Sequence, residues 1–150
     1  MKIRIEVDET TIEDEVIIRC KDIDENVIKI KQLVMDAVNE STTLICLKGK
    51  TEFYLPLKEI LFFETDGEKI NVHTRDDIYT IKKKLYELEE TLPGYFFRSS
   101  KSAIVNLNHI YSIEHNISST SIVSFKGTHK QLFVSRRYYA ILKERMASRR

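Results

Sequence analysis

Charged and hydroxyl side chains gather where the strands of this chain are expected to end. They lie at Glu68-Lys69, at Arg98-Ser-Ser-Lys-Ser102, at Lys126 and at Ser135-Arg-Arg137. Lysine and arginine neutralise phosphate groups, serine hydroxyls hydrogen-bond phosphate oxygens, and an arginine can bind a guanine through two hydrogen bonds. These residue types, on loops that project from a rigid sheet, therefore suit contact with duplex DNA.

Patterns typical of catalysis or metal binding do not occur in the sequence. The four histidines, at positions 73, 109, 115 and 129, have neither i,i+4 nor His-x-Glu spacing, and no serine-hydrolase, zinc-protease or glycine-rich phosphate-binding motif is present. Ser100 or Ser102 could be combined with a distant histidine and aspartate, but nothing local activates either hydroxyl. We therefore expect no enzyme activity, no cofactor and no metal.

Cysteine usage and the absence of export signals indicate the compartment. Cys20 and Cys46 lie in apolar, strand-like stretches without the spacing of a zinc site or a disulfide framework. We expect two small buried thiols, with a paired or redox-active role as the alternative. No apolar run approaches the ~20 residues that span a bilayer, and the N-terminus does not resemble a signal peptide. The expected location is the cytoplasm.

Charges are sorted along the chain, although the net charge is only +1. Residues 1–44 contain 6 basic and 11 acidic residues, whereas residues 98–150 contain 10 basic and 2 acidic residues. Such asymmetry is typical of a part that faces a polyanion, joined to a part with a different task. The alternative is that the C-terminal excess, which includes Lys143, Arg145, Arg149 and Arg150, only solvates a terminal helix.

The first 42 residues are expected to form a small β-β-α unit. Apolar residues alternate over Lys2–Val7 and run together over Val16–Ile18, which predicts two strands. Asp24 can cap a helix from about Glu25 to Asn39. The apolar face of this helix carries Val27, Ile30, Val34, Ala37 and Val38. A unit of this size buries too little surface to stand alone, so that face must pack on the rest of the chain or on a second subunit.

From Thr43 onward the sequence predicts short antiparallel strands joined by tight turns. The strand-like stretches are TLICLKG, TEFYLPL, ILFFE, KINVHT and IYTI, followed later by AIVNL, HIYSI, SIVSF and QLFVS. One helix, from about Lys82 to Thr91, separates the two sets and ends before Pro93-Gly94. Ser135 can cap a final helix whose Tyr139, Leu142 and Met146 face inward. The expected fold class is mainly β (α+β), with one internal and one C-terminal helix.

Five blocks of sequence carry a family pattern. They are Ile60-Leu-Phe-Phe-Glu64, Leu85-Tyr-Glu-Leu-Glu-Glu90, Phe97-Arg-Ser-Ser-Lys-Ser102, Ile104-Val-Asn106 with Ile110, and Val134-Ser-Arg-Arg-Tyr138. In order and spacing they resemble the LytTR family of bacterial DNA-binding domains, over about residues 43 to 147. The resemblance implies an elongated domain of small antiparallel sheets, whose loops enter successive major grooves of duplex DNA, usually at imperfect direct repeats.

The resemblance also implies three loops that contact DNA. They fall on Glu68 and Lys69, on Ser100 and Lys101 with Arg98 beside them, and on Arg137 with Ser135 and Arg136. Arg137 matches the base-reading arginine of the family, and Lys101 is expected at the phosphate backbone.

Several of these residues have a second interpretation that is purely structural. Arg98 could pair with an acidic neighbour and brace its strand instead of touching phosphate. Ser135 is expected to serve first as a helix N-cap. Ser102 and Asn106 are expected to hydrogen-bond the backbone at strand ends rather than meet DNA.

Residues 1–42 are too short for the receiver domain that commonly precedes a LytTR domain, so the chain resembles the receiver-less members of the family. We expect residues 1–42 to serve in homodimer formation or in docking a protein partner, and residues 43–150 to bind promoter DNA in a transcriptional regulator. The alternative is a protein-interaction module whose DNA-binding surface is repurposed, or is masked by the acidic N-terminal unit.

Overall fold

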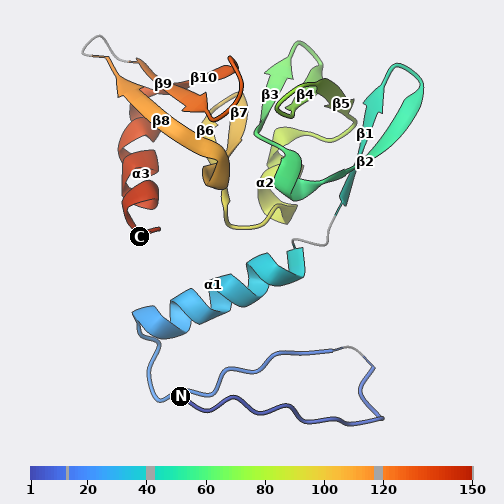
Figure 1. Cartoon of the computed structure of the whole chain (residues 1–150), viewed down its shortest axis with the longest axis vertical. Coiled ribbons are helices and arrows are strands. Elements are labelled where there is room, and N and C mark those ends of the chain that lie inside the picture. Colours follow the sequence, from blue (N-terminus) through green and yellow to red (C-terminus); the bar gives the residue numbers. More distant parts are fainter. Residues whose placement is uncertain (13, 40–42, 117–119, 150) are drawn as a thin grey trace.

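The computed structural model describes residues 1–12, 14–39, 43–116 and 120–149 (Figure 1). Its helices are α1 (Glu25–Asn39), α2 (Leu85–Thr91) and α3 (Arg136–Ala147). Its strands are β1 (Thr43–Lys48), β2 (Thr51–Pro56), β3 (Phe62–Asp66), β4 (Lys69–His73), β5 (Ile78–Ile81), β6 (Phe96–Ser100), β7 (Ala103–Asn106), β8 (Ile110–His115), β9 (Thr120–Phe125) and β10 (Gln131–Ser135).

Within the described residues the strands form two antiparallel sheets. The larger has the order β2-β1-β5-β4-β3-β7-β6 and the smaller the order β10-β9-β8. Figure 1 shows the two sheets side by side, with α3 on the smaller sheet, α2 on the larger one and α1 on the opposite side of the molecule from the β3–β4 hairpin. The predicted class, mainly β with an internal and a C-terminal helix, is confirmed.

Strand β6 was not expected as a separate strand. Its polar residues Arg98, Ser99 and Ser100 interrupt the apolar alternation by which strands are recognised. The strand pairs with β7, and a β-bulge between Arg98 and Ser100 shifts the register. A bulge bends its strand and redirects the neighbouring side chains. Here it leaves Ser99 fully buried, while Arg98 and Ser100 remain partly exposed.

The two strands predicted at Lys2–Val7 and Val16–Ile18 are not formed, so this prediction was wrong. Neither segment has regular secondary structure, and Ile3 and Ile5 are 92% and 87% exposed. An apolar alternation specifies which side chains share a face of a strand, but not whether another element packs against that face. Without such packing, an isolated pair of strands is only marginally stable in water. The expected domain boundary after residue 42 adjoins residues 40–42, which lie outside the described part of the chain.

The predicted N-terminal helix is confirmed as α1. The Asp24 carboxylate caps it by accepting a hydrogen bond from the Val27 N–H at 2.9 Å. On its apolar face Val27, Ile30 and Val34 are half-buried, whereas the expected face residues Ala37 and Val38 are exposed. Every fully buried hydrophobic side chain of the described chain lies at Cys46 or later, so α1 adds nothing to the core.

The two cysteines differ in their exposure to solvent. Cys46 is fully buried in β1, as expected, and burial raises the pKa of its thiol to about 11. Cys20 is exposed, so the expectation that it is buried was wrong. Cys20 lies in the N-terminal segment that contributes no core side chain to this structure, which explains its exposure.

Two hydrophobic clusters stabilise the rest of the chain, and consecutive residues of β3 supply both. Phe63 and Phe62 point to opposite faces of the strand. Phe63 belongs to the cluster under α2, which includes Cys46, Ile60, Val72, Leu88 and Ile104. Phe62 belongs to the cluster that joins the two sheets and α3, which includes Val105, Val123, Phe125, Leu132, Val134 and Leu142. The Phe62 ring stacks on His73 at 4.2 Å and on Phe125 at 5.3 Å, measured between centroids.

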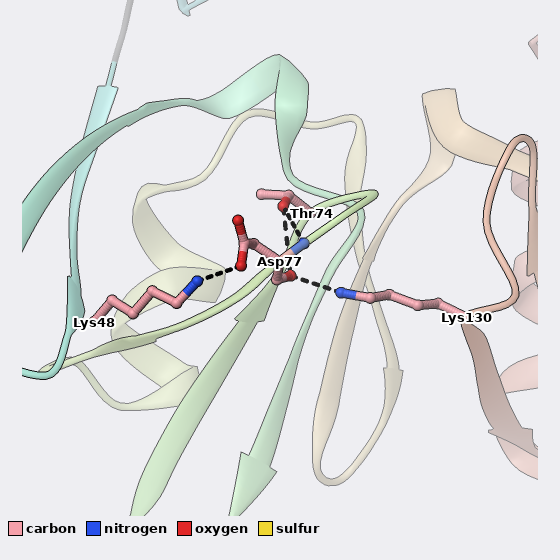
Figure 2. Close-up of polar contacts among 4 residues, drawn as sticks. All are labelled: Lys48, Thr74, Asp77 and Lys130. Atoms are coloured by element: carbon pink, nitrogen blue, oxygen red, sulfur yellow. Dashed lines mark hydrogen bonds and ion pairs between the residues drawn. The ribbon is translucent and has the colours of Figure 1, made fainter.

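A polar link joins the two sheets near the same place (Figure 2). The Lys130 ammonium, at the end of the β9–β10 loop, donates to the backbone carbonyl of Asp77 at 2.6 Å. The Asp77 carboxylate forms an ion pair with Lys48. The backbone N–H of Asp77 donates a hydrogen bond to the Thr74 hydroxyl at 3.1 Å. Burial, and secondarily the charge of Lys130, lowers the pKa of His73 to about 4, so the ring that stacks on Phe62 is neutral at physiological pH.

Asn106 ends β7 and is fully buried. Its side-chain amide donates to the Ile60 carbonyl at 2.9 Å, and its side-chain oxygen accepts from the Asn108 N–H at 3.0 Å. The expectation that Asn106 hydrogen-bonds backbone is confirmed. Since the Ile60 carbonyl is enclosed by the protein, it depends on this amide for its pairing.

We expect Asn106→Ala to lower the free energy of unfolding by about 1–3 kcal/mol, because it leaves a buried carbonyl without a donor. Urea denaturation followed by circular dichroism measures this change. Asn108→Ala is the matched control: its side chain is exposed, so its effect should stay within about 0.5 kcal/mol. Equal unfolding midpoints for Asn106→Ala and the unmodified chain would contradict the assigned role.

Candidate nucleic-acid interface

The first predicted DNA-contacting loop is the tight β3–β4 hairpin. Asp66 pairs with Lys69, so Gly67 and Glu68 form the turn. Gly67 has φ of +63°, a left-handed conformation that glycine adopts without steric cost. Glu68 and Lys69 are both exposed at the tip. The structure therefore places both predicted residues on an exposed projection.

Negative charge limits what this hairpin can do with a polyanion. Asp66 and Glu68 lie at the tip beside Lys69, and Glu64 lies half-buried below them. Burial, with a smaller contribution from the Asp66 charge, raises the pKa of the Glu64 carboxyl. Lys69 is the only lysine or arginine in residues 62–73, so this hairpin by itself offers a polyanion little positive charge.

The second predicted loop is the β6–β7 turn, and Arg98 braces it. The guanidinium donates to the Ser100 carbonyl at 2.8 Å and to the Lys101 carbonyl at 2.6 Å, and it forms a salt bridge with Glu89 of α2 at 2.8 Å. The Arg98 side chain is only 22% exposed. Of the two interpretations of Arg98, the bracing one describes its contacts in this structure; contact with DNA stays a prediction.

Lys101 and the serines around it form the tip of the same turn. Lys101 is exposed. The Ser100 hydroxyl accepts a hydrogen bond from the Ser102 N–H at 3.2 Å, and the two hydroxyl oxygens are 3.3 Å apart. Ser102 was expected to bond the backbone through its side chain, but the short turn places its hydroxyl against Ser100 instead. The Ser102 carbonyl accepts from the Thr65 N–H at 2.8 Å, which ties this turn to the β3–β4 hairpin.

The third predicted loop is the junction of β10 and α3. Ser135 occupies the N-cap position, as expected, but its side chain makes no capping hydrogen bond. Arg136 and Arg137 begin the helix and are exposed. The Arg137 guanidinium lies 5.9 Å from the centre of the Tyr138 ring and makes no salt bridge within the described residues. The helix itself is anchored by fully buried Leu142.

A hollow in the surface brings the first two loops together. Its lining consists of Thr65, Glu68, Ile70, Lys83, Lys84, Leu85, Tyr86, Arg98 and Lys101. Arg137 and its neighbours do not line it, since they lie at the junction of β10 and α3. Figure 1 shows the start of α3 and the tip of the β3–β4 hairpin on the same side of the molecule, away from α1.

Lys83 and Lys84 were not among the predicted site residues. They belong to a run of three lysines that connects β5 to α2, and both are exposed. The run is visible in the sequence, but a short run of like charge before a helix usually marks a solvated surface. Only the fold shows that it lies beside Lys101.

The helices do not form a helix-turn-helix. In the described chain, five strands separate α1 from α2, and five more separate α2 from α3. No described helix is long and apolar enough to cross a membrane. The exposed cations of the three predicted loops and of the hollow therefore lie on loops, in the β5–α2 connection and in the first turn of α3, rather than along a recognition helix.

Comparisons with known proteins agree with this architecture. The family model of the LytTr DNA-binding domain matches residues 50–147. An uncharacterized HTH-type transcriptional regulator of Staphylococcus aureus strain NCTC 8325 / PS 47 is 28% identical over 150 residues, which cover 98% of this chain and 99% of the relative. A second such regulator, from the bovine strain RF122 / ET3-1, is 31% identical over 119 residues, which cover 77% of this chain and 80% of the relative.

A solved structure is also similar. It is the LytTr DNA-binding domain of a protein described as a methyl-accepting/DNA response regulator from Bacillus cereus, with a TM-score of 0.64 and 26% sequence identity. The match covers 69% of this chain and 95% of that one. Since the family model spans well over half of the residues and the fold agrees, this chain belongs to the LytTR family of DNA-binding domains.

Proposed function

We propose that this protein is a bacterial transcriptional regulator that reads promoter DNA by inserting loops of its β-rich domain into the major groove, at imperfect direct repeats. The observation that carries the proposal is the exposed Arg137, which has no acidic partner in the described chain and begins α3 on the side that also holds the β3–β4 hairpin. Such a protein would act in the cytoplasm, where bacterial DNA lies.

The proposed contacts divide into base reading and phosphate binding. Arg137 has the planar, forked guanidinium that binds guanine through two hydrogen bonds. Lys101, Lys69 and Arg136 supply exposed positive charges for the phosphate backbone. The remaining proposed contacts are the Ser100 and Ser135 hydroxyls, the Glu68 carboxylate and Arg98. For Arg98 the main proposed role is positioning, because its guanidinium fixes the carbonyl of Lys101.

We further propose that residues 1–39 join two copies of the chain. This segment exposes a large apolar surface, with Val7 90% exposed, Leu33 68% exposed and Ile28 56% exposed. Large exposed apolar patches mark interaction sites in soluble proteins, and these three exposed side chains all lie in this one segment. A second copy is the favoured partner because repeated half-sites on DNA can bind two linked domains at once. When the first domain is bound, the second has a high effective concentration at the neighbouring half-site.

Arg137→Ala should cost about 1–3 kcal/mol of binding energy on the specific site and relax the preference at one base position, since a base contact is lost. Lys101→Ala should weaken specific and random duplexes alike and reduce the salt slope by about one, since a phosphate contact is lost. Fluorescence anisotropy with the DNA upstream of the protein's own coding region, between 50 and 200 mM salt, measures both effects.

Lys29→Ala provides the control for these variants, because it removes one exposed charge from α1 instead of from the interface. Affinity for DNA that stays flat over the salt range would count against the proposed function and favour a protein-interaction module. An equal loss on specific and random DNA for Arg137→Ala would remove only its base-reading role.

Ile28→Glu combined with Leu33→Glu should convert a dimer into a monomer, because it places two carboxylates in the proposed apolar interface. Glutamate is a good helix former, so α1 should persist. Light scattering after size-exclusion chromatography measures the mass. Tyr111→Glu is the control, since Tyr111 is 71% exposed on β8, outside the N-terminal segment. An unmodified chain that is already monomeric at tens of micromolar would show that this surface serves another partner.

A further inference from the structure

We propose that Lys83 and Lys84 form, together with Lys101, a phosphate-binding site that adds the β5–α2 connection to the DNA interface. The inference rests on the proposed function and extends it to a part of the chain outside the three loops expected from the family resemblance. The site is the hollow between the β3–β4 hairpin, the β6–β7 turn and the start of α2.

The charges that line the hollow are unbalanced. Three lysines, Lys83, Lys84 and Lys101, line the hollow together with a single acidic residue, Glu68. None of the three lysines forms a salt bridge with any residue of the described chain. Ammonium groups held near one another raise the local positive potential, and a bound anion relieves their repulsion.

Arg98 does not compete for this anion, because its guanidinium is already paired with a carboxylate and two backbone carbonyls. Its guanidinium forms the salt bridge with Glu89 and donates to the carbonyls of Ser100 and Lys101. It forms part of the wall of the hollow. The lysines, which form no salt bridge within the described chain, are therefore available to a ligand. Arg98 instead holds the β6–β7 turn against α2.

Polar contacts and buried side chains join the elements around the hollow. Arg98 connects the β6–β7 turn to α2 through Glu89, and the Thr65 N–H connects the same turn to the β3–β4 hairpin. Buried Leu85 and Leu88 fix α2 on the larger sheet. The lysines at the start of α2 are thus attached to the same frame as Lys101. A site that is already organised loses less conformational entropy when its ligand binds.

A DNA phosphate is the ligand that fits this chemistry. Lysine acts as a flexible point charge that contacts phosphate without reading sequence. The hollow borders Glu68 and Lys101, which are both proposed to meet the duplex. A phosphate of the backbone would reach Lys83 and Lys84 while the neighbouring loops enter the groove.

The test compares the full-length double variant Lys83→Ala/Lys84→Ala with Lys29→Ala/Lys31→Ala, which removes the same charge from exposed positions on α1. Binding to one specific and one random duplex is followed by anisotropy from 50 to 200 mM salt. We expect the hollow variant to reduce the slope of log K against log salt by about two, with the preference for the specific duplex unchanged. The α1 variant should keep the slope of the unmodified chain.

A hollow variant with an unchanged slope would overturn the proposal, and so would an equal reduction in the α1 variant, which would reveal a general effect of net charge. Melting curves for both variants confirm that each is folded. Failure of the proposed function is distinguishable, because the unmodified chain would then show no salt-dependent binding to either duplex. If binding by the unmodified chain depends steeply on salt and the hollow variant has the same slope, only this site is rejected.

Discussion

The position of the two sheets relative to each other depends on the packing of Phe62. Its ring lies between His73 of the larger sheet and Phe125 of the smaller one, and the cluster around it continues into α3 through Leu142. The proposed DNA-contacting loops are divided between these sheets, so their spacing is set by this buried contact. Since DNA presents its grooves at a fixed pitch, the core determines which loops can reach them together.

Ion pairing separates the cations of this domain into two groups. Arg98 and Lys48 have acidic partners, Glu89 and Asp77, and these pairs connect elements of the fold. The lysines around the hollow and Arg137 have no such partner within the described residues. A net charge close to zero conceals this division, because a cation that is neutralised by a neighbour contributes little to the attraction of a polyanion.

Much of the fold could be predicted from the sequence, because apolar alternation and turn residues report local structure directly. The strands from Thr43 onward and the cap of α1 at Asp24 are examples. The failures have a common cause, which is that pairing between distant residues is not encoded locally. Nothing local shows that the extended N-terminal segment lacks a partner strand, that Glu89 reaches Arg98, or that Lys83 lies beside Lys101.

The link between Lys130 and Asp77 has a consequence for how this sequence can diverge. Lys130 donates to a backbone carbonyl, which every amino acid possesses. The side chain at position 77 can therefore change during evolution without loss of this hydrogen bond, although the exposed pair with Lys48 and the attraction between the Asp77 and Lys130 charges are then lost. Position 130 has no such freedom, since a shorter side chain cannot span from the β9–β10 loop to the β4–β5 turn. A hydrogen bond between a side chain and a backbone carbonyl therefore constrains the residue type at the side-chain position and leaves the residue type at the carbonyl position free to change.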